Sequence, residues 1–143
     1  MPSRLANLLL AAIINSPLHP VLGESFAVIA VRGRRSGKLI RTPVNVARVG
    51  DMLTVISQRE RTWWRNLRAG QDAQLRLNGR NLPVRGEVLE NAERVGEALA
   101  SYFAARPEYA KYFNVRLRPD GTPAPEDLRT AAAGRVVIQL HEV

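Results

Sequence analysis

The segment 40–57 reads as a β-hairpin, and it constrains the fold more than any other part of the chain. Ile40, Thr42, Val44 and Val46 alternate with Arg41, Asn45 and Ala47, which is typical of a strand with one buried face. Gly50-Asp51 then provides a turn into an apolar run at 52–57. Pro43 lies inside the first strand, and proline is confined to sheet edges or bulges because it has no backbone N–H. We therefore expect an antiparallel pair whose first strand has an edge or a bulge at Pro43.

A second hairpin is predicted from 73–78 and 83–89 around Asn78-Gly79, a dipeptide that favours tight two-residue turns. Its expected inward positions are Leu75, Leu77, Val84 and Val88.

The other expected elements are short and flank these hairpins. They are a helix over 3–15, a strand over 26–31, a short helix over 62–69 capped by Thr62 and closed by Gly70, a helix over 93–105 with a further helical turn over 108–113, a short helix over 126–133 and a final strand over 135–140. About six strands, mostly in hairpins, with peripheral helices indicate a small barrel-like α+β domain.

The length of 143 residues suits one domain covering 1–143. Its expected parts are an N-terminal helix within 1–16, barrel strands over 26–90, a helical segment over 92–113 and the last strand over 135–141.

The apolar run 8–14 is too short to span a bilayer, and no small-residue cleavage site follows it. We expect a retained helix and a cytoplasmic protein. Burial of this helix in the core and its contact with a membrane or a partner both stay open.

Positive charge is concentrated in the middle of the chain. The net charge is +8, and nineteen of the 21 basic residues are arginines. Between Arg32 and Arg85 thirteen basic residues face three acidic ones, so this window carries the whole excess. A concentrated positive field implies an anionic partner, and the guanidinium fork favours phosphate or carboxylate groups.

Several catalytic classes are disfavoured. The chain has no cysteine, so a thiol nucleophile, an iron–sulfur cluster and a cysteine zinc site are excluded. His19 and His141 lie at opposite ends of the sequence, and no metal-ligand or serine-hydrolase motif is present. We predict no metal site.

The turn segment Val31-Arg32-Gly33-Arg34-Arg35-Ser36-Gly37-Lys38 joins two expected strands and offers four cationic side chains, a hydroxyl and glycines. Such a turn can gather its N–H groups around an anion while its side chains hold outer oxygens. It is not a phosphate-binding loop of the Walker type, because a strand follows it. The alternative is a solvated hairpin tip.

Neighbouring motifs extend this turn into a specific pattern. Arg41-Thr42-Pro43-Val44 follows it, then a strand ending at Ser57-Gln58-Arg59, and then Trp63-Trp64-Arg65-Asn66-Leu67-Arg68-Ala69. From about Phe26 to Val88 the sequence closely resembles the deazaflavin-dependent nitroreductase family, which consists of split-β-barrel proteins that bind coenzyme F420. The resemblance therefore implies a split barrel and an F420-dependent oxidoreductase.

The resemblance also implies roles for individual residues. The residues expected to hold the anionic tail of the coenzyme are Arg34, Arg35, Ser36, Gly37, Lys38, Arg41 and Arg59. Thr42, Pro43 and Val44 would lie along the deazaflavin ring, and Ser57 and Gln58 would meet its polar edge. Trp64 and Asn66 would fix the short helix that closes the site, with Arg68 near the phosphate. Of the adjacent Trp63 and Trp64, at most one is expected to face the site.

In such an enzyme the coenzyme donates hydride and the protein supplies binding and orientation. The acceptor would be a quinone, a nitroaromatic or an activated alkene. Five aromatic residues gather within 102–113, and of these Tyr109 and Tyr112 are candidates for an acceptor pocket or a proton donor. Core packing explains the same spacing.

Alternatives stay open at this stage. The same barrel can bind FMN, haem or a lipid, with or without redox activity, and split barrels often form homodimers. The arginine cluster favours the long F420 tail over the single phosphate of FMN. A basic nucleic-acid binder is the rival from another class, but no helix-turn-helix or RNA-binding aromatic motif is present, so we expect no nucleic acid. Arg48, Arg76, Arg80 and Arg85 are predicted to be solvated.

Overall fold

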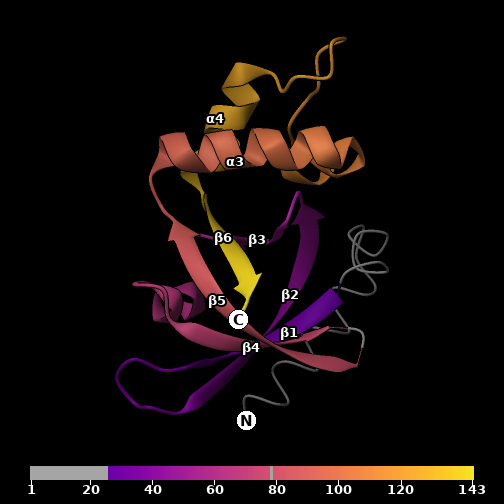
Figure 1. Ribbon diagram of the computed structural model, residues 1–143. Helices are drawn as coiled ribbons and strands as arrows, with labels where there is room; N and C mark the ends of the chain where they lie inside the picture. Colours follow the sequence, from indigo (N-terminus) through magenta and orange to yellow (C-terminus); the bar gives the residue numbers. More distant parts are fainter. Residues whose placement is uncertain (1–25, 78) are drawn as a thin grey trace.

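The computed structural model describes residues 26–77 and 79–143, and these form a closed six-stranded antiparallel barrel flanked by helices (Figure 1). The strands are β1 Phe26–Arg32, β2 Leu39–Val49, β3 Met52–Gln58, β4 Asp72–Leu77, β5 Arg80–Leu89 and β6 Arg135–Glu142. Their order around the barrel is β1-β2-β3-β6-β5-β4, and pairing of β1 with β4 closes it. The expected α+β split-barrel class is confirmed.

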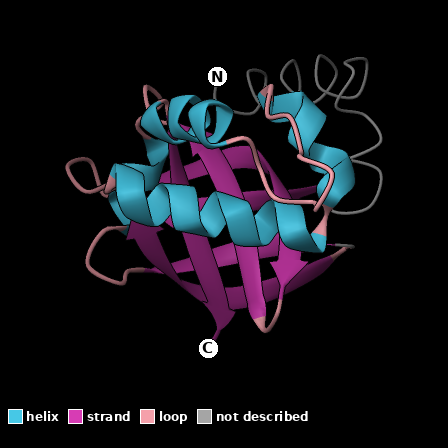
Figure 2. Ribbon diagram, turned by 90° about the horizontal axis from the view of Figure 1, so that it is seen from above, coloured by secondary structure: helices cyan, strands magenta, loops and turns pink. Residues whose placement is uncertain are grey.

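In the described part of the chain, four helical segments connect or cover the strands. They are η1 Trp63–Leu67, α3 Ala92–Ala105, η2 Pro107–Phe113 and α4 Pro125–Ala133. Seen from above in Figure 2, α3 runs across the barrel, and Figure 1 shows α3 and α4 together over one end of it. The helix expected over 3–15 lies outside the described residues. Within the described part of the chain, no helix is both long and apolar enough to cross a bilayer.

Alternate strand residues fill the barrel interior. The fully buried side chains there include Ile29, Leu75, Val84, Ile138 and Leu140. Because successive side chains of a strand point to opposite faces, period-two patterning places this set on one side of the closed sheet. Leu75 and Val84 confirm the predicted inward positions of the second hairpin, and Leu77 and Val88 pack against the same core while partly buried.

A second core lies outside the barrel wall, beneath the helices. Ala47 of β2 and Val137 of β6 turn outward and pack with Leu99 and Phe103 of α3. The helices therefore cover part of the outer face of the sheet. This explains why Ala47, expected on the open side of a half-buried strand, is in fact buried.

Strand register places Pro43 where β2 has one neighbour. β2 pairs with β1 from Leu39 to Asn45 but with β3 only from Val46 to Val49. Pro43 lies opposite Val28 of β1 and outside the ladder with β3. Of the edge or bulge predicted at this proline, the structure shows the edge, because the β2–β3 ladder already ends at Val46.

Most element boundaries agree with the sequence, with two differences. β5 begins at Arg80, three residues earlier than expected, because Arg80–Asn81 continue the ladder with β4. The helix expected over 62–69 is a five-residue 3₁₀ turn, and within the described chain Thr62 gives it no side-chain cap. The chain leaves η1 through Ala69 and Gly70, which both have positive φ.

Candidate functional site

The turn between β1 and β2 is closed by its own hydrogen bonds. The Gly33 N–H donates to the Lys38 carbonyl oxygen at 2.7 Å, and the Gly37 N–H donates to the Gly33 carbonyl oxygen at 2.9 Å. Gly37 adopts a φ of 70°, a left-handed conformation that glycine enters without strain. These two N–H groups, which the sequence had offered to an anion, are therefore already bonded within the turn.

Side chains of the turn divide into two groups. Arg32 donates to the Gly37 carbonyl oxygen at 2.6 Å, and the Ser36 hydroxyl accepts from the Lys38 N–H at 3.2 Å, so both stabilise the turn itself. Arg34, Arg35 and Lys38 are exposed. These three cations are available to an anion in solution.

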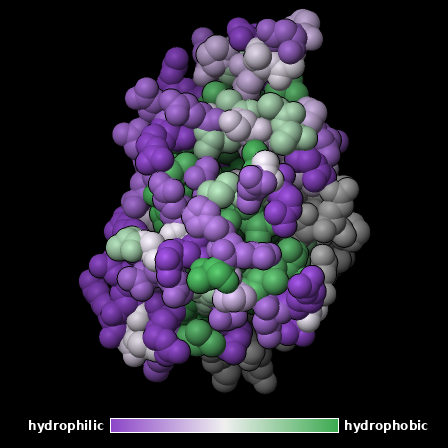
Figure 3. Space-filling model, viewed as in Figure 1, coloured by the Kyte–Doolittle hydropathy of each residue, from purple (hydrophilic) through white to green (hydrophobic). Residues whose placement is uncertain are grey.

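Asn66 connects the turn to η1. Its side-chain oxygen accepts the Arg34 N–H at 3.0 Å, and its side-chain nitrogen donates to the Trp63 carbonyl oxygen at 3.0 Å. In Figure 1, η1 and the indigo β1–β2 hairpin lie together at the lower left, where the space-filling view in Figure 3 is strongly hydrophilic. Residues 32 positions apart in sequence thereby form one surface.

Two adjoining grooves lie along this surface. One, of about 510 Å³, is lined by Arg32, Gly33, Arg34, Asn66, Arg68, Ala69 and Gln71. The other, of about 640 Å³, is lined by Gly33, Arg34, Arg35, Ser36, Ile40, Thr62, Arg65, Asn66 and Arg68. Gly33, Arg34, Asn66 and Arg68 line both, so the grooves meet at the Arg34–Asn66 contact.

The grooves are strongly positive. Among residues 26–77 and 79–143, no acidic side chain pairs with Arg34, Arg35 or Arg65. Arg68 is the exception, because it binds both carboxylate oxygens of Glu90, at 2.9 Å from Nε and 2.6 Å from Nη2. This contact holds the pKa of the Glu90 carboxyl below its usual value, so Glu90 is ionised at neutral pH.

The two tryptophans of η1 anchor it to the barrel. Both are buried in the interior core. The sequence predicts that at most one of them faces the site, and in the structure neither faces the grooves. The guanidinium carbons of Arg68 and Arg65 lie 5.1 Å and 5.6 Å from the centre of the Trp64 ring. Trp64 thus supports two groove cations from beneath.

The end of β3 is bound into the protein. The Ser57 hydroxyl accepts from the buried Trp63 Nε1 at 3.1 Å and donates to the Gln58 carbonyl oxygen at 3.2 Å. The Arg59 guanidinium donates to the carbonyl oxygens of Glu90 and Arg135. Arg59, expected at the coenzyme tail, therefore links the ends of three strands.

The structure brings part of the expected set together. Arg34, Arg35, Ser36, Asn66 and Arg68 line the grooves. Among the described lining residues we do not find the other expected ones: Gly37, Lys38, Arg41, Thr42, Pro43, Val44, Ser57, Gln58, Arg59 and Trp64. Thr42 and Val44 are buried, whereas Lys38 and Arg41 are exposed beside the turn.

Arg32, one of the four cations of the predicted basic turn, lines one groove. Sequence reasoning missed three other lining residues that have functional groups. Arg65 lies inside the Trp63–Ala69 motif, so its charge was a usable signal. Thr62 was considered only as a helix cap. Gln71 follows the reversal at Ala69 and Gly70, and nothing in its sequence context marks it.

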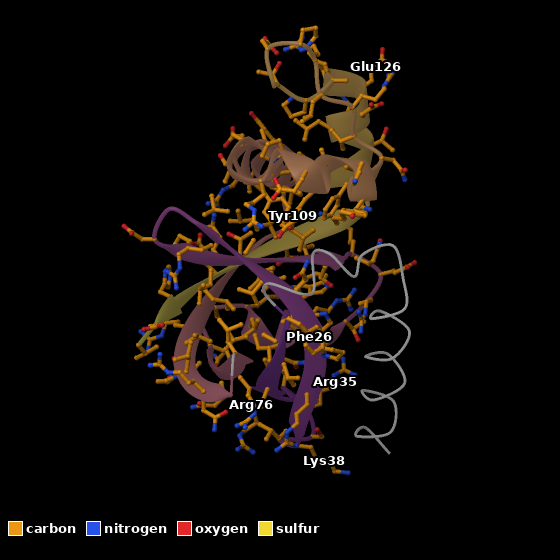
Figure 4. The ribbon with its side chains drawn as sticks, turned by 90° about the vertical axis from the view of Figure 1, so that its right-hand side faces the viewer. Phe26, Arg35, Lys38, Arg76, Tyr109 and Glu126 are labelled. Atoms are coloured by element: carbon orange, nitrogen blue, oxygen red, sulfur yellow. The ribbon has the colours of Figure 1, made fainter. Side chains whose placement is uncertain are left out.

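Tyr109 and Tyr112 belong to the second core. Tyr109 is buried, with its ring 5.7 Å from that of Tyr102, and Tyr112 is partly buried against the same cluster. Figure 4 shows Tyr109 at the helical end of the molecule and Arg35 and Lys38 toward the other end. The structure therefore does not place these tyrosines in the grooves with the arginines.

Comparison with known protein families gives a match over residues 17–119 to the F420H(2)-dependent quinone reductase family. The chain belongs to this family. The match confirms the resemblance to deazaflavin-dependent reductases that the motifs indicated, and membership of the F420H(2)-dependent quinone reductase family supports an F420-dependent oxidoreductase. No curated protein matches the chain in sequence.

Solved structures share the fold at low sequence identity. A conserved hypothetical protein from Mycobacterium tuberculosis is 13% identical with a TM-score of 0.54, over 94% of this chain and 79% of that one. A protein of unknown function from Agrobacterium tumefaciens is 16% identical with a TM-score of 0.53, over 90% of this chain and 56% of that one. An FAD and haem binding protein from Mycobacterium smegmatis is 18% identical with a TM-score of 0.50, over 90% of this chain and 67% of that one. At such identities these likenesses concern the fold alone.

Proposed function

We propose that this protein is a reductase that uses reduced coenzyme F420 to transfer hydride to a small apolar acceptor, a quinone in the first instance. Nitroaromatics and activated alkenes are acceptors of the same class. The observation that carries the proposal is the pair of adjoining grooves lined by Arg34, Arg35, Arg65 and Arg68. Family membership supports the same cofactor.

The grooves fit a long anionic group. F420 carries a phosphate and several carboxylates on one chain, so it offers anions at successive positions. Arg34 and Arg35 belong to the turn, Arg65 belongs to η1 and Arg68 directly follows η1, so cations border the surface from two sides. Three of these guanidinium groups have no acidic partner among the described residues, and each is free to bind two oxygens.

The deazaflavin ring would lie where β2 and β3 are no longer paired with each other. Thr42, Pro43 and Val44 stand on the stretch of β2 that pairs only with β1, and Ser57 and Gln58 end β3 beyond its ladder with β2. These are the positions to which the sequence resemblance assigns ring contacts. Lys38 and Arg41, exposed beside the turn, would add to the field that attracts the tail.

When bound, reduced F420 supplies the hydride, so the protein needs no nucleophile of its own. The residues of this chain would bind the coenzyme and orient it. The arginines would hold the charged end, while Asn66 keeps the turn and η1 at a fixed separation. Fixed geometry between bound reactants supplies much of the rate enhancement in such reactions.

A fluorescence titration tests the cofactor. The purified protein is titrated with F420 and with FMN, and tighter binding of F420 is expected because its tail spans more cations. Equal binding of the two, or binding of neither, contradicts the proposal. Oxidation of reduced F420 is then followed by absorbance with a quinone, a nitroaromatic and an activated alkene.

Paired variants test the tail contacts. Arg34→Ala with Arg35→Ala is expected to weaken F420 binding by about tenfold to a hundredfold, from the loss of charge-assisted hydrogen bonds. Binding of a tail-less deazaflavin should change little. Arg76→Ala with Arg80→Ala removes the same charge from exposed positions outside the groove lining and serves as the control. If the binding of F420 and of the tail-less deazaflavin weakens by the same factor, the turn does not hold the tail.

A further inference from the structure

Among the described residues, Glu90 is an acidic residue that pairs with a cation of the grooves, Arg68. It lies between the end of β5 and the start of α3, where its carboxylate binds Arg68 and is also within the field of Arg59 and Arg65. Arg68 lines both grooves. A negative side chain at an anion site opposes the ligand that the arginines attract, so Glu90 calls for an explanation.

Holding the fold together does not explain the ion pair. The side chains of Arg68 and Glu90 are 41% and 34% exposed. Ion pairs as exposed as this contribute little to the free energy of unfolding. The backbone of Glu90 is fixed independently, because its carbonyl oxygen accepts from Arg59. The carboxylate is therefore free to respond to what occupies the grooves.

The contact with Arg68 has the form of a ligand contact. Two parallel N–H donors of one guanidinium edge meet the two oxygens of a planar anion, at 2.9 Å and 2.6 Å. A phosphate or a carboxylate of a ligand would use the same donors in the same way. Resting over the Trp64 ring, the Arg68 guanidinium is positioned to bind such a group without rebuilding η1.

We propose that Glu90 is an internal counter-ion that Arg68 exchanges for an anionic group of the ligand, so that Glu90 determines how anionic a ligand must be to bind. This proposal rests on the proposed function in taking the grooves as the binding site of a polyanion. An anionic group that binds Arg68 has to replace an existing bidentate pair. A ligand with several anionic groups also gains Arg34 and Arg35, whose guanidinium groups have no acidic partner in the described chain.

The test compares Glu90→Gln with Glu87→Gln. Gln is nearly isosteric and keeps the backbone contact to Arg59, so the fold is retained, and thermal unfolding checks this. Glu87 is an exposed β5 residue that pairs with Arg94 at 3.5 Å and is outside the groove lining, so its variant removes the same charge elsewhere. Each protein is titrated with F420, with a tail-less deazaflavin and with inorganic tripolyphosphate.

Glu90→Gln is expected to bind F420 and tripolyphosphate about threefold to tenfold more tightly than Glu87→Gln. Removing one negative charge close to the ligand at a hydrated surface has an effect of this size. The tail-less deazaflavin should bind equally to both. Equal or weaker binding of the anions by Glu90→Gln overturns the proposal. If tripolyphosphate binds more tightly to Glu90→Gln while F420 does not bind the wild type, the exchange stands and the proposed cofactor is wrong.

A second comparison separates exchange at Arg68 from a general field. In an Arg68→Ala background, adding Glu90→Gln should change tripolyphosphate affinity by less than twofold, because the exchanging partner is gone. If the full gain persists without Arg68, Glu90 acts through its field alone and the proposal fails.

Discussion

The side-chain oxygen of Asn66 accepts the backbone N–H of Arg34 at 3.0 Å, and this bond joins the two elements that line both grooves. Asn66 also donates to the Trp63 carbonyl oxygen within its own helical turn. One amide thus fixes the basic turn to η1. The position of the arginines relative to one another depends on it.

Replacing Asn66 tests this connection. Asn66→Ala loses both bonds and should lower the free energy of unfolding by about 1–2 kcal/mol and weaken F420 binding. Asn66→Asp keeps an acceptor for the Arg34 N–H but adds a negative charge. It should therefore weaken the binding of F420 more than the binding of a tail-less deazaflavin. Urea denaturation and fluorescence titration measure the two effects. Full coenzyme affinity in Asn66→Ala would show that the bond does not organise the site.

Ser57 has a structural partner that can be tested apart from any ring contact. Its hydroxyl is the acceptor of the buried Trp63 Nε1 at 3.1 Å. Ser57→Ala leaves that N–H without its partner inside the protein, and the expected loss is about 1–3 kcal/mol in the free energy of unfolding. Combining Ser57→Ala with Trp63→Phe, against Trp63→Phe alone, removes the orphaned donor, so the serine change should cost less there. An unchanged cost would mean that the hydrogen bond is not its source.

Gly86 brings β5 close to η1. A Cβ at this position would lie 3.2 Å from Leu140 Cδ2 and 3.5 Å from both terminal methyl carbons of Leu67, all in the packed core. Gly86→Ala is therefore expected to lower the free energy of unfolding by about 1–3 kcal/mol through overpacking. Gly134→Ala, where a Cβ meets nothing within 4 Å, is the control. Equal stability of the two variants would indicate that the Leu140 and Leu67 side chains move aside freely.

Asp127 gives a pH-dependent prediction. Its carboxylate accepts from the backbone N–H of Arg116 at 3.0 Å and from Nε at 2.9 Å, and these bonds hold the pKa of Asp127 below its usual value. A lowered pKa contributes stability above the unfolded-state pKa, and that contribution is lost as the pH falls through the folded-state pKa. Asp127→Asn should therefore have a lower Tm than wild type near pH 7, with the difference shrinking below about pH 4.

Calorimetric scans across this pH range measure the difference. Glu126→Gln is the neighbouring control, since Glu126 is exposed and its carboxylate makes no hydrogen bond or ion pair among the described contacts. A Tm difference for Asp127→Asn that stays constant through the acid range would contradict the assignment.

Local patterns in the sequence determined the strands and their pairing. Alternation at 40–49 and the glycine turns at Gly50 and Gly79 are short-range signals, and β2–β3 and β4–β5 form where they predict. Pro43 marked an edge because the missing N–H is a property of the residue itself. The charge concentrated between Arg32 and Arg85 likewise pointed to an anion before any fold was known.

Contacts between distant segments decided the rest. Ser57 and Arg59 carry motif positions, yet folding pairs them with Trp63 and with the carbonyls of Glu90 and Arg135. Tyr109 has the spacing of a pocket residue and of a core residue alike, and only its packing against Tyr102 separates the two. Glu90 attracted no notice in the sequence, because its meaning comes from Arg68, 22 positions away. Sequence reports residue type and local periodicity, whereas barrel closure decides which charges meet.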